Sequence, residues 1–247
     1  MDYLGITRAY YAQWLGIAPE GMERASAEFL HALRRNEVQK GYGWPDDLYI
    51  WVAGNRVIAS YGDKAEGEIC RLEQAICPGM AAEEIALAVQ SVWRIAARRS
   101  VKFVYDSLPE IEGHSRKMVA EDYPLYEAFF TTCNPGCTDI GWLREYFDEM
   151  IASGLCFGEI VDGKLACMND LPAMPFMEER VREIGINTLP AHRGKGLARR
   201  VCLSAIREMI EKGICPQWSA ANTNEASARL AHSLGFRKMA DVLTITL

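Results

Sequence analysis

The sequence predicts an α/β (α+β) fold in which a mixed sheet is covered by helices. Two hairpins are the first observation: strand-like runs flank Gly54-Asn55 and, later, Asp162-Gly163, which is a dipeptide typical of tight β-turns. The second observation is the alternation of strands and helices from residue 181 onward. The third is a hydrophobic content of 49% in 247 residues, which is enough to build a packed core.

Helices are expected where apolar residues recur three or four positions apart, and strands where short apolar runs lie between turns. In the first region this predicts helices over residues 4–15, 21–35 and 82–99, and strands over 48–53, 56–61, 68–72 and 101–105. In the second it predicts helices over 122–130, 139–153, 196–212 and 224–234, strands over 117–119, 155–161, 164–169, 181–190 and 215–220, and a closing pair of short strands over 236–247. Residues 170–179 are expected to form an apolar loop, either exposed near a site or packed on the core.

The chain divides into an N-terminal region, residues 1–112, and a second domain, residues 113–247. The two are interpreted as copies of one unit, because each contains a hairpin that begins with Leu and ends with Asp, over 48–63 and 155–170. The copies differ at one place. The second has Arg193-Gly-Lys-Gly-Leu-Ala198, whereas the first has Cys77-Pro-Gly-Met-Ala-Ala82, without paired glycines or basic residues.

The turn at Gly194 and Gly196 has the composition of an anion site. It joins an apolar strand, which ends at Pro190, directly to a helix. Closely spaced glycines let backbone N–H groups approach a phosphate, and the N-terminus of the following helix adds unpaired N–H groups and a positive dipole end. A phosphorylated ligand is therefore expected at this turn.

Charge and composition restrict the partners. The net charge of −6 argues against nucleic acid, but residues 181–247 hold ten Lys/Arg and five Asp/Glu, so this segment is basic and suits a small polyanion. No apolar run is long enough for a membrane span, and no signal peptide is recognisable, so a cytoplasmic location is expected. The eight cysteines are expected to be free, buried thiols, and their spacing predicts no metal site.

Two segments carry a resemblance to a known family. The run from Arg193 to Ala198 resembles the acetyl-CoA pyrophosphate motif of GNAT superfamily N-acetyltransferases, and Asn224-Glu-Ala-Ser-Ala-Arg-Leu-Ala-His-Ser-Leu-Gly-Phe236 resembles a second GNAT segment. Thr188, the Leu-Ala pair and the additional N-terminal region also resemble the subgroup that includes zwittermicin-resistance acetyltransferases. The resemblance implies a GNAT-type mixed, mostly antiparallel sheet flanked by helices, preceded by a degenerate GNAT-like half.

The resemblance also implies a co-substrate and the residues that bind it. Acetyl-CoA would be the acyl donor, an amine of a small molecule the acceptor, and no metal would take part. The strand edge would pair with the pantetheine arm, and the turn would hold the pyrophosphate. The cofactor-binding residues expected on this basis are Ile186, Asn187, Thr188, Arg193, Gly194, Lys195, Gly196, Leu197, Ala198 and Asn224, with Arg199 as a further source of charge. A simple helix N-cap is the alternative interpretation of Asn224.

Acyl transfer to an amine needs a base and a proton donor for the leaving thiolate. Glu183, at the start of the strand, is the candidate base. The family commonly uses a tyrosine as the donor, but Ala231 stands at that position. Ser227 lies on the same helical face and is the candidate replacement, with water as an alternative. The absent tyrosine leaves a second function open, a non-catalytic acyl-CoA-binding sensor or interaction module.

Overall fold

Strands from both regions of the chain form two sheets. The computed structural model describes residues 1–107 and 114–247. Within them, a seven-stranded sheet has the order β1-β3-β2-β11-β4-β10-β8, and a four-stranded sheet has the order β5-β6-β7-β9. The strands are β1 Ser26–His31, β2 Leu48–Ala53, β3 Arg56–Tyr61, β4 Arg98–Tyr105, β5 Arg116–Lys117, β6 Phe157–Val161, β7 Lys164–Asp170, β8 Val181–Glu183, β9 Gly185–Thr188, β10 Cys215–Ala221 and β11 Phe236–Ile245. All neighbours pair antiparallel except β1 with β3 and β8 with β10, so the mixed, mostly antiparallel sheet is confirmed.

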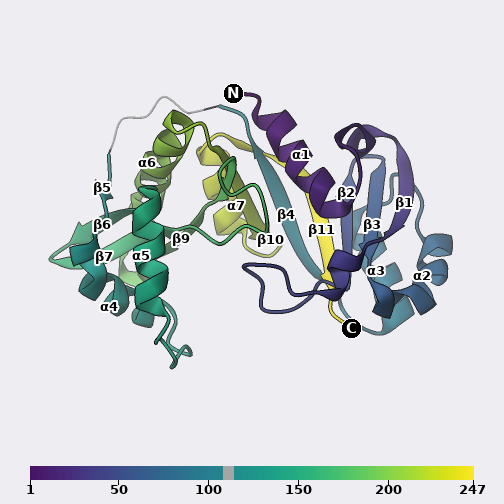
Figure 1. Cartoon of the computed structure of the whole chain (residues 1–247), viewed down its shortest axis with the longest axis horizontal. Helices are drawn as coiled ribbons and strands as arrows, with labels where there is room; N and C mark the ends of the chain where they lie inside the picture. The colour runs from purple at the N-terminus through teal and green to yellow at the C-terminus, as the bar shows by residue number, and fades with distance from the viewer. Residues whose placement is uncertain (108–113) are drawn as a thin grey trace.

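Helices cover both faces of the large sheet and flank the small one. They are α1 Tyr3–Leu15, α2 Asp63–Ala75, α3 Ala82–Trp93, α4 Tyr123–Cys133, α5 Leu143–Ser153, α6 Leu197–Glu211 and α7 Glu225–Ser233. On β2, Tyr49 and Trp51 pack with α1, while Leu48, Ile50 and Val52 pack with α2 and α3. This alternation is the period of two that a strand buried on both faces requires. Figure 1 shows β4 and β11 between the β1–β3 side of the molecule and the side that carries α6 and α7.

The predicted boundary between residues 112 and 113 lies outside the described residues. A core cluster joins the two sheets: Phe103 and Trp218 of the large sheet pack in it with Leu165 and Met168 of the small one. None of the helices in the described ranges is both long and apolar enough to cross a membrane.

Both predicted hairpins are confirmed. β2 pairs with β3 across Gly54-Asn55, and β6 pairs with β7 across Asp162-Gly163. Asp162 and Gly163 both have positive φ, 50° and 74°, which is the conformation that the type I′ turn demands.

The helix predicted over residues 21–35 is wrong. The segment forms a short 3₁₀ turn over Pro19–Glu23, the strand β1, and a second 3₁₀ turn over Leu33–Asn36. Phe29 packs with the α2–α3 side of the sheet and the next residue, Leu30, with the α1 side. Pairing with β3, which lies far along the chain, therefore overrides the local helical spacing.

The strand predicted over residues 68–72 is also wrong, because these residues lie inside α2. Ile69 and Leu72 are three positions apart and are buried on the helix face that meets the sheet. The first region therefore has a helix where the second has the strands β8 and β9, so the two regions do not repeat each other at this place.

Several element boundaries differ from the prediction. α3 ends at Trp93 because Arg94 adopts a left-handed conformation with φ 61°, and β4 starts soon afterwards. α5 begins at Leu143, four residues later than expected, and β5 has only two residues. The closing pair of strands is one strand, β11, with an irregularity between Lys238 and Ala240.

All eight cysteines are free, as predicted, but only half of them are buried. Cys156, Cys167, Cys202 and Cys215 are buried, whereas Cys70 and Cys77 are exposed. The apolar loop over residues 170–179 packs on the core, where Met174 is buried and Phe176 lies 4.8 Å from the ring of Tyr10.

Candidate active site

The strand that leads to the glycine turn changes its partner halfway along. β8 pairs with β10 as far as Glu183 and Gln217, and the Ile184 N–H donates to the Gln217 carbonyl at 3.1 Å. From Gly185 onward the chain pairs with β7 instead, as β9. The edges of β9 and β10 that face each other diverge, and a cavity of about 720 Å³ opens between them. Backbone N–H and C=O groups on these edges are available to a ligand.

The start of α6 forms one side of this cavity. Gly194 and Gly196 have φ of 73° and 75°, a left-handed conformation that favours glycine. Apart from the adjacent residues, no described atom lies within 4 Å of where either Cβ would stand. In the described structure α6 has no side-chain N-cap and no acidic residue in its first turn. Its first N–H groups and the positive end of its dipole therefore meet an open space, an arrangement that attracts an anion.

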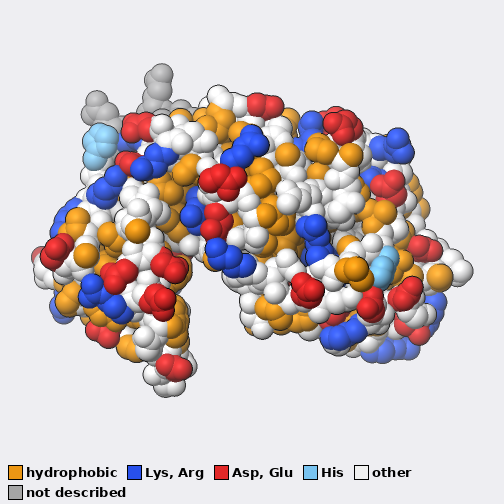
Figure 2. Space-filling model, viewed as in Figure 1, with side chains coloured by type: hydrophobic (Ala, Val, Ile, Leu, Met, Phe, Trp, Pro, Cys, Tyr) orange, Lys and Arg blue, Asp and Glu red, His pale blue; other side chains and the backbone are white. Residues whose placement is uncertain are grey.

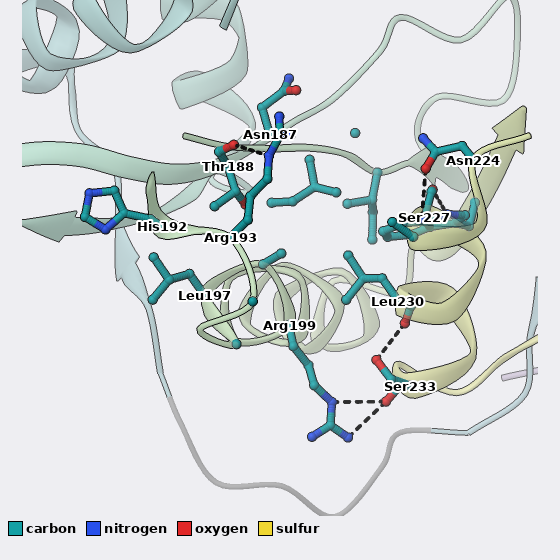
Figure 3. Close-up of a pocket in the computed structure, with 18 of the residues that line it drawn as sticks. Asn187, Thr188, His192, Arg193, Leu197, Arg199, Asn224, Ser227, Leu230 and Ser233 are labelled. Atoms are coloured by element: carbon teal, nitrogen blue, oxygen red, sulfur yellow. Dashed lines mark hydrogen bonds between the residues drawn. The ribbon is translucent and has the colours of Figure 1, made fainter. Parts of the chain in front are cut away.

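α7 forms the opposite wall. Figure 3 shows Asn187 and Thr188 on one side and Asn224, Ser227, Leu230 and Ser233 on the other, with α6 between them. Asn224 is the N-cap of α7, because its Oδ1 accepts from the Ser227 N–H at 3.1 Å. It also lines the cavity, so capping and contact with a ligand are compatible at this residue.

Consecutive residues of β10 hold the two candidate catalytic side chains. Trp218 Nε1 donates to Ser227 Oγ at 3.0 Å, and Ser219 Oγ donates to Glu183 Oε1. Since indole is only a donor, the Ser227 hydroxyl accepts this bond and keeps its own proton for an acceptor in the cavity. Sequence reasoning missed both β10 residues. The alternation of side chains along a strand could have indicated them, because neighbouring residues of β10 point to opposite faces of the sheet beside the place where the strands diverge.

Eleven of the twelve predicted site residues line the one cavity: Glu183, Ile186, Asn187, Thr188, Arg193, Gly194, Gly196, Leu197, Ala198, Asn224 and Ser227. The exception is Lys195, whose side chain is exposed on the turn.

The basic residues near the turn have different partners. Arg193 donates to the Thr188 carbonyl at 3.2 Å, and Arg199 donates to the Ser233 carbonyl at 3.0 Å, so both keep their charge beside the cavity. Arg200 pairs with Glu159 and is thereby partly neutralised.

Comparison with known proteins is consistent with this geometry. Residues 172–242, which include the turn, α6 and α7, match the family model described as GNAT acetyltransferase. An acetyltransferase of the GNAT family from Colwellia psychrerythraea aligns with a TM-score of 0.52 at 18% identity, over 60% of this chain and 55% of that one. A GCN5-related N-acetyltransferase from Sphaerobacter thermophilus aligns with a TM-score of 0.53 at 14% identity, over 66% of this chain and 56% of that one.

The chain has the GNAT fold. The family-model match supports the GNAT acetyltransferase superfamily over the segment that contains the cavity. This chain spans a little over half the length of each of the two aligned structures. A search of curated protein sequences gave no significant match.

Proposed function

We propose that this protein is an N-acetyltransferase, which transfers an acetyl or another short acyl group from its CoA thioester to an amine of a small molecule. The observation that carries the proposal is that the opening between β9 and β10 and the uncapped start of α6 line the same cavity. The opening suits an extended pantetheine arm, and the helix start suits a pyrophosphate. The Thr188 and Leu197-Ala198 positions, with the additional N-terminal region, favour the subgroup that includes zwittermicin-resistance acetyltransferases.

In this proposal, different residues bind the pyrophosphate and the pantetheine arm of the acyl donor. The N–H groups of Gly194 to Ala198 hold the pyrophosphate, and Arg193 and Lys195 supply positive charge. Ile186, Asn187 and Thr188 offer the open edge of β9 to the pantetheine amides, because that edge has no neighbouring strand in the described structure. Asn224 contacts the donor from α7.

The transfer needs two proton-handling groups. The amine nitrogen attacks the thioester carbonyl carbon, the new N–C bond forms, and the C–S bond breaks. Glu183 takes the proton that the amine loses, with its carboxylate oriented by Ser219. Ser227 donates a hydrogen bond to the departing sulfur, and solvent supplies the proton that the thiolate finally takes.

Titration calorimetry and a thiol-release assay test the proposal. Acetyl-CoA binds, and free CoA appears when amines are added to the complex. A protein that does not bind acetyl-CoA contradicts the proposal.

The second candidate is an acyl-CoA-binding sensor that performs no transfer. The specific observation in its favour is Ala231, which is fully buried and stands where the resembling enzymes carry a tyrosine. Tight acetyl-CoA binding without transfer to a broad panel of amines supports this candidate against the first.

A further inference from the structure

A second cavity adjoins the candidate active site. Its volume is about 350 Å³, and it lies between α4, α5, β7 and the loop after β7. Asn187 lines both cavities, so the two meet at β9. Figure 2 shows the molecule hollowed between the side that carries α4 and α5 and the body to its right.

The N-terminal region borders this cavity through Gly41. Gly41, in the segment before β2, lies so close to the loop after β7 that a Cβ on it would be 2.3 Å from the Ala173 carbonyl oxygen. The neighbouring Lys40 pairs with Glu178 at 3.0 Å and ties the two segments together. The resulting space of about 350 Å³ is small, which limits how much of a ligand it can hold.

One carboxylate stands among the aromatic walls of this cavity. Among the described residues that line it, Asp170 is the only charged one. Its Oδ1 is buried and has no hydrogen-bond partner in the described structure. The carboxylate lies against Gly185, where a Cβ would stand 1.6 Å from Oδ1, so only glycine at that position leaves room for it. Because Gly185 lines the first cavity, Asp170 stands where the two cavities meet.

The negative charge of the Asp170 carboxylate favours a cationic ligand in this cavity. Burial and the nearby Glu183 raise the pKa of Asp170 to about 6, so the group is ionised at neutral pH. A buried carboxylate oxygen without a partner is unfavourable, and an ammonium group placed beside it offsets part of that cost. Aromatic rings also attract a cation that lies over their faces, and five rings line this cavity. These rings belong to Tyr126, Phe129, Phe130, Trp142 and Tyr146.

We infer that this second cavity is the acceptor site, and that it takes a small primary amine with a single positive charge on an apolar body, held by Asp170. The inference rests on the proposed function and narrows its substrate class. A polycation such as a polyamine or an aminoglycoside would bring its additional charges into a cavity whose described lining has one carboxylate, the other lining residues being uncharged. A peptide N-terminus has the same single charge, but only its first residues fit in about 350 Å³, so most of the chain would lie outside the cavity.

An acceptor panel tests the substrate class. Acetyl transfer from acetyl-CoA is measured with 2-phenylethylamine, spermidine, kanamycin and Ala-Ala-Ala. The expected result is a kcat/KM for 2-phenylethylamine at least about tenfold above that of the other three. A preference for spermidine or kanamycin overturns the single-charge assignment, and a preference for the peptide overturns the small-molecule assignment.

Two variants test the residues. Asp170→Asn is expected to raise the KM for 2-phenylethylamine by about tenfold or more, with kcat changed less and the acetyl-CoA Kd unchanged. Trp142→Ala, in a partly exposed side chain, is expected to raise the same KM by a few-fold. Asp148→Asn is the matched control, because this exposed aspartate of α5 pairs with Arg144 and does not line the cavity. An unchanged KM in Asp170→Asn overturns the role of this carboxylate.

Direct titration separates this inference from the proposed function. 2-Phenylethylamine is titrated into the protein without acetyl-CoA, and its affinity is expected to fall about tenfold in Asp170→Asn. Failure of acetyl-CoA to bind contradicts the proposed function, whereas failure of the amine to bind, with acetyl-CoA bound normally, contradicts the acceptor site alone.

Discussion

The starts of α3 and α6 are the most informative comparison between the two regions of this molecule. α3 carries Glu83 and Glu84 in its first turn, and Glu84 Oε2 accepts from the Ala81 N–H at 2.8 Å. α6 has no acid in its first turn and no side-chain cap in the described structure, and it follows two left-handed glycines. The positive end of α3 is therefore neutralised by its own side chains, whereas that of α6 is left for a ligand.

The aspartates at the ends of the two hairpins differ in the same way. Asp63 is exposed, and hydrogen bonds from Asn36 and His31 hold its pKa below the usual value. Asp170, at the corresponding end of the second hairpin, has a raised pKa because of its burial and the proximity of Glu183. Asp63 in the N-terminal region is therefore satisfied within the chain. In the C-terminal region the Oδ1 of Asp170 is left without a hydrogen-bond partner where two cavities adjoin, which favours binding of a ligand.

Replacing one glycine before α6 and one before α3 gives the strongest test of the difference between the two helix starts. Gly196→Val is expected to raise the acetyl-CoA Kd by about 100-fold or more, because the side chain strains the left-handed residue and fills the space for the pyrophosphate. Gly79→Val is the matched control, with a similar φ of 86° before α3, and it should leave the Kd unchanged. Calorimetry that finds equal affinities in the two variants contradicts the assignment of the turn.

The features that distinguish the start of α6 from that of α3 could largely be predicted from sequence, because they depend on residues close together in the chain. Paired glycines, basic neighbours and the periodicity of α6 all lie within one short stretch, and the Asp162-Gly163 hairpin depends only on its own turn. β1 could not be found in this way, because its partner β3 is distant and its residues fit a helical spacing equally well. The environment of Asp170 is likewise non-local, since it depends on Gly185 across the sheet and on rings from α4 and α5.

Removing the candidate base should affect the chemical step and leave donor binding intact. Glu183→Gln is expected to lower kcat by about 100-fold, because the amine then loses its proton without assistance, while the acetyl-CoA Kd stays within twofold. Glu84→Gln, in the first turn of α3, provides the control and should leave kcat unchanged. The measurement is the pH–rate profile of each variant, and a Glu183→Gln profile identical to that of the unmodified protein removes this residue as the base.

Neutralising the two hairpin aspartates should change the Tm differently, with a rise at Asp170 and none at Asp63. The folded protein binds the Asp170 proton more tightly than the unfolded chain, so stability is lost as the pH rises from 3.8 to about 6 and stays lower above that range. Asp170→Asn is therefore expected to stabilise the protein at pH 8 by about 2 kcal/mol, after a discount for the partly exposed side chain, or by several degrees in Tm. Asp63→Asn, at the exposed position, should not raise Tm.

Other titratable groups interact with Asp170, and their charge at pH 8 also affects the Tm of the Asp170→Asn variant. They are Glu183 on β8, Tyr126 on α4, Tyr146 on α5, Cys156 before β6 and Cys202 on α6. Burial raises the pKa of the tyrosines and thiols, so these stay neutral at pH 8. A Tm for Asp170→Asn that is lower at pH 8 than that of the unmodified protein contradicts the unsatisfied carboxylate.

Giving α6 an acid in its first turn should make it resemble α3. Ala198→Glu places a carboxylate beside the uncapped N–H groups, where it competes with the pyrophosphate, and the acetyl-CoA Kd is expected to rise about tenfold. Ala198→Gln is the uncharged control and should have the smaller effect. Equal affinities for the two variants would mean that charge at this helix start does not govern binding.

The stoichiometry of acetyl-CoA binding tests the contrast between the two regions most directly. Titration calorimetry of the unmodified protein should give one site per chain, because α3 lacks the open, uncapped start that α6 presents. A stoichiometry of two, or one site that survives in Gly196→Val and is lost in Gly79→Val, would contradict the account.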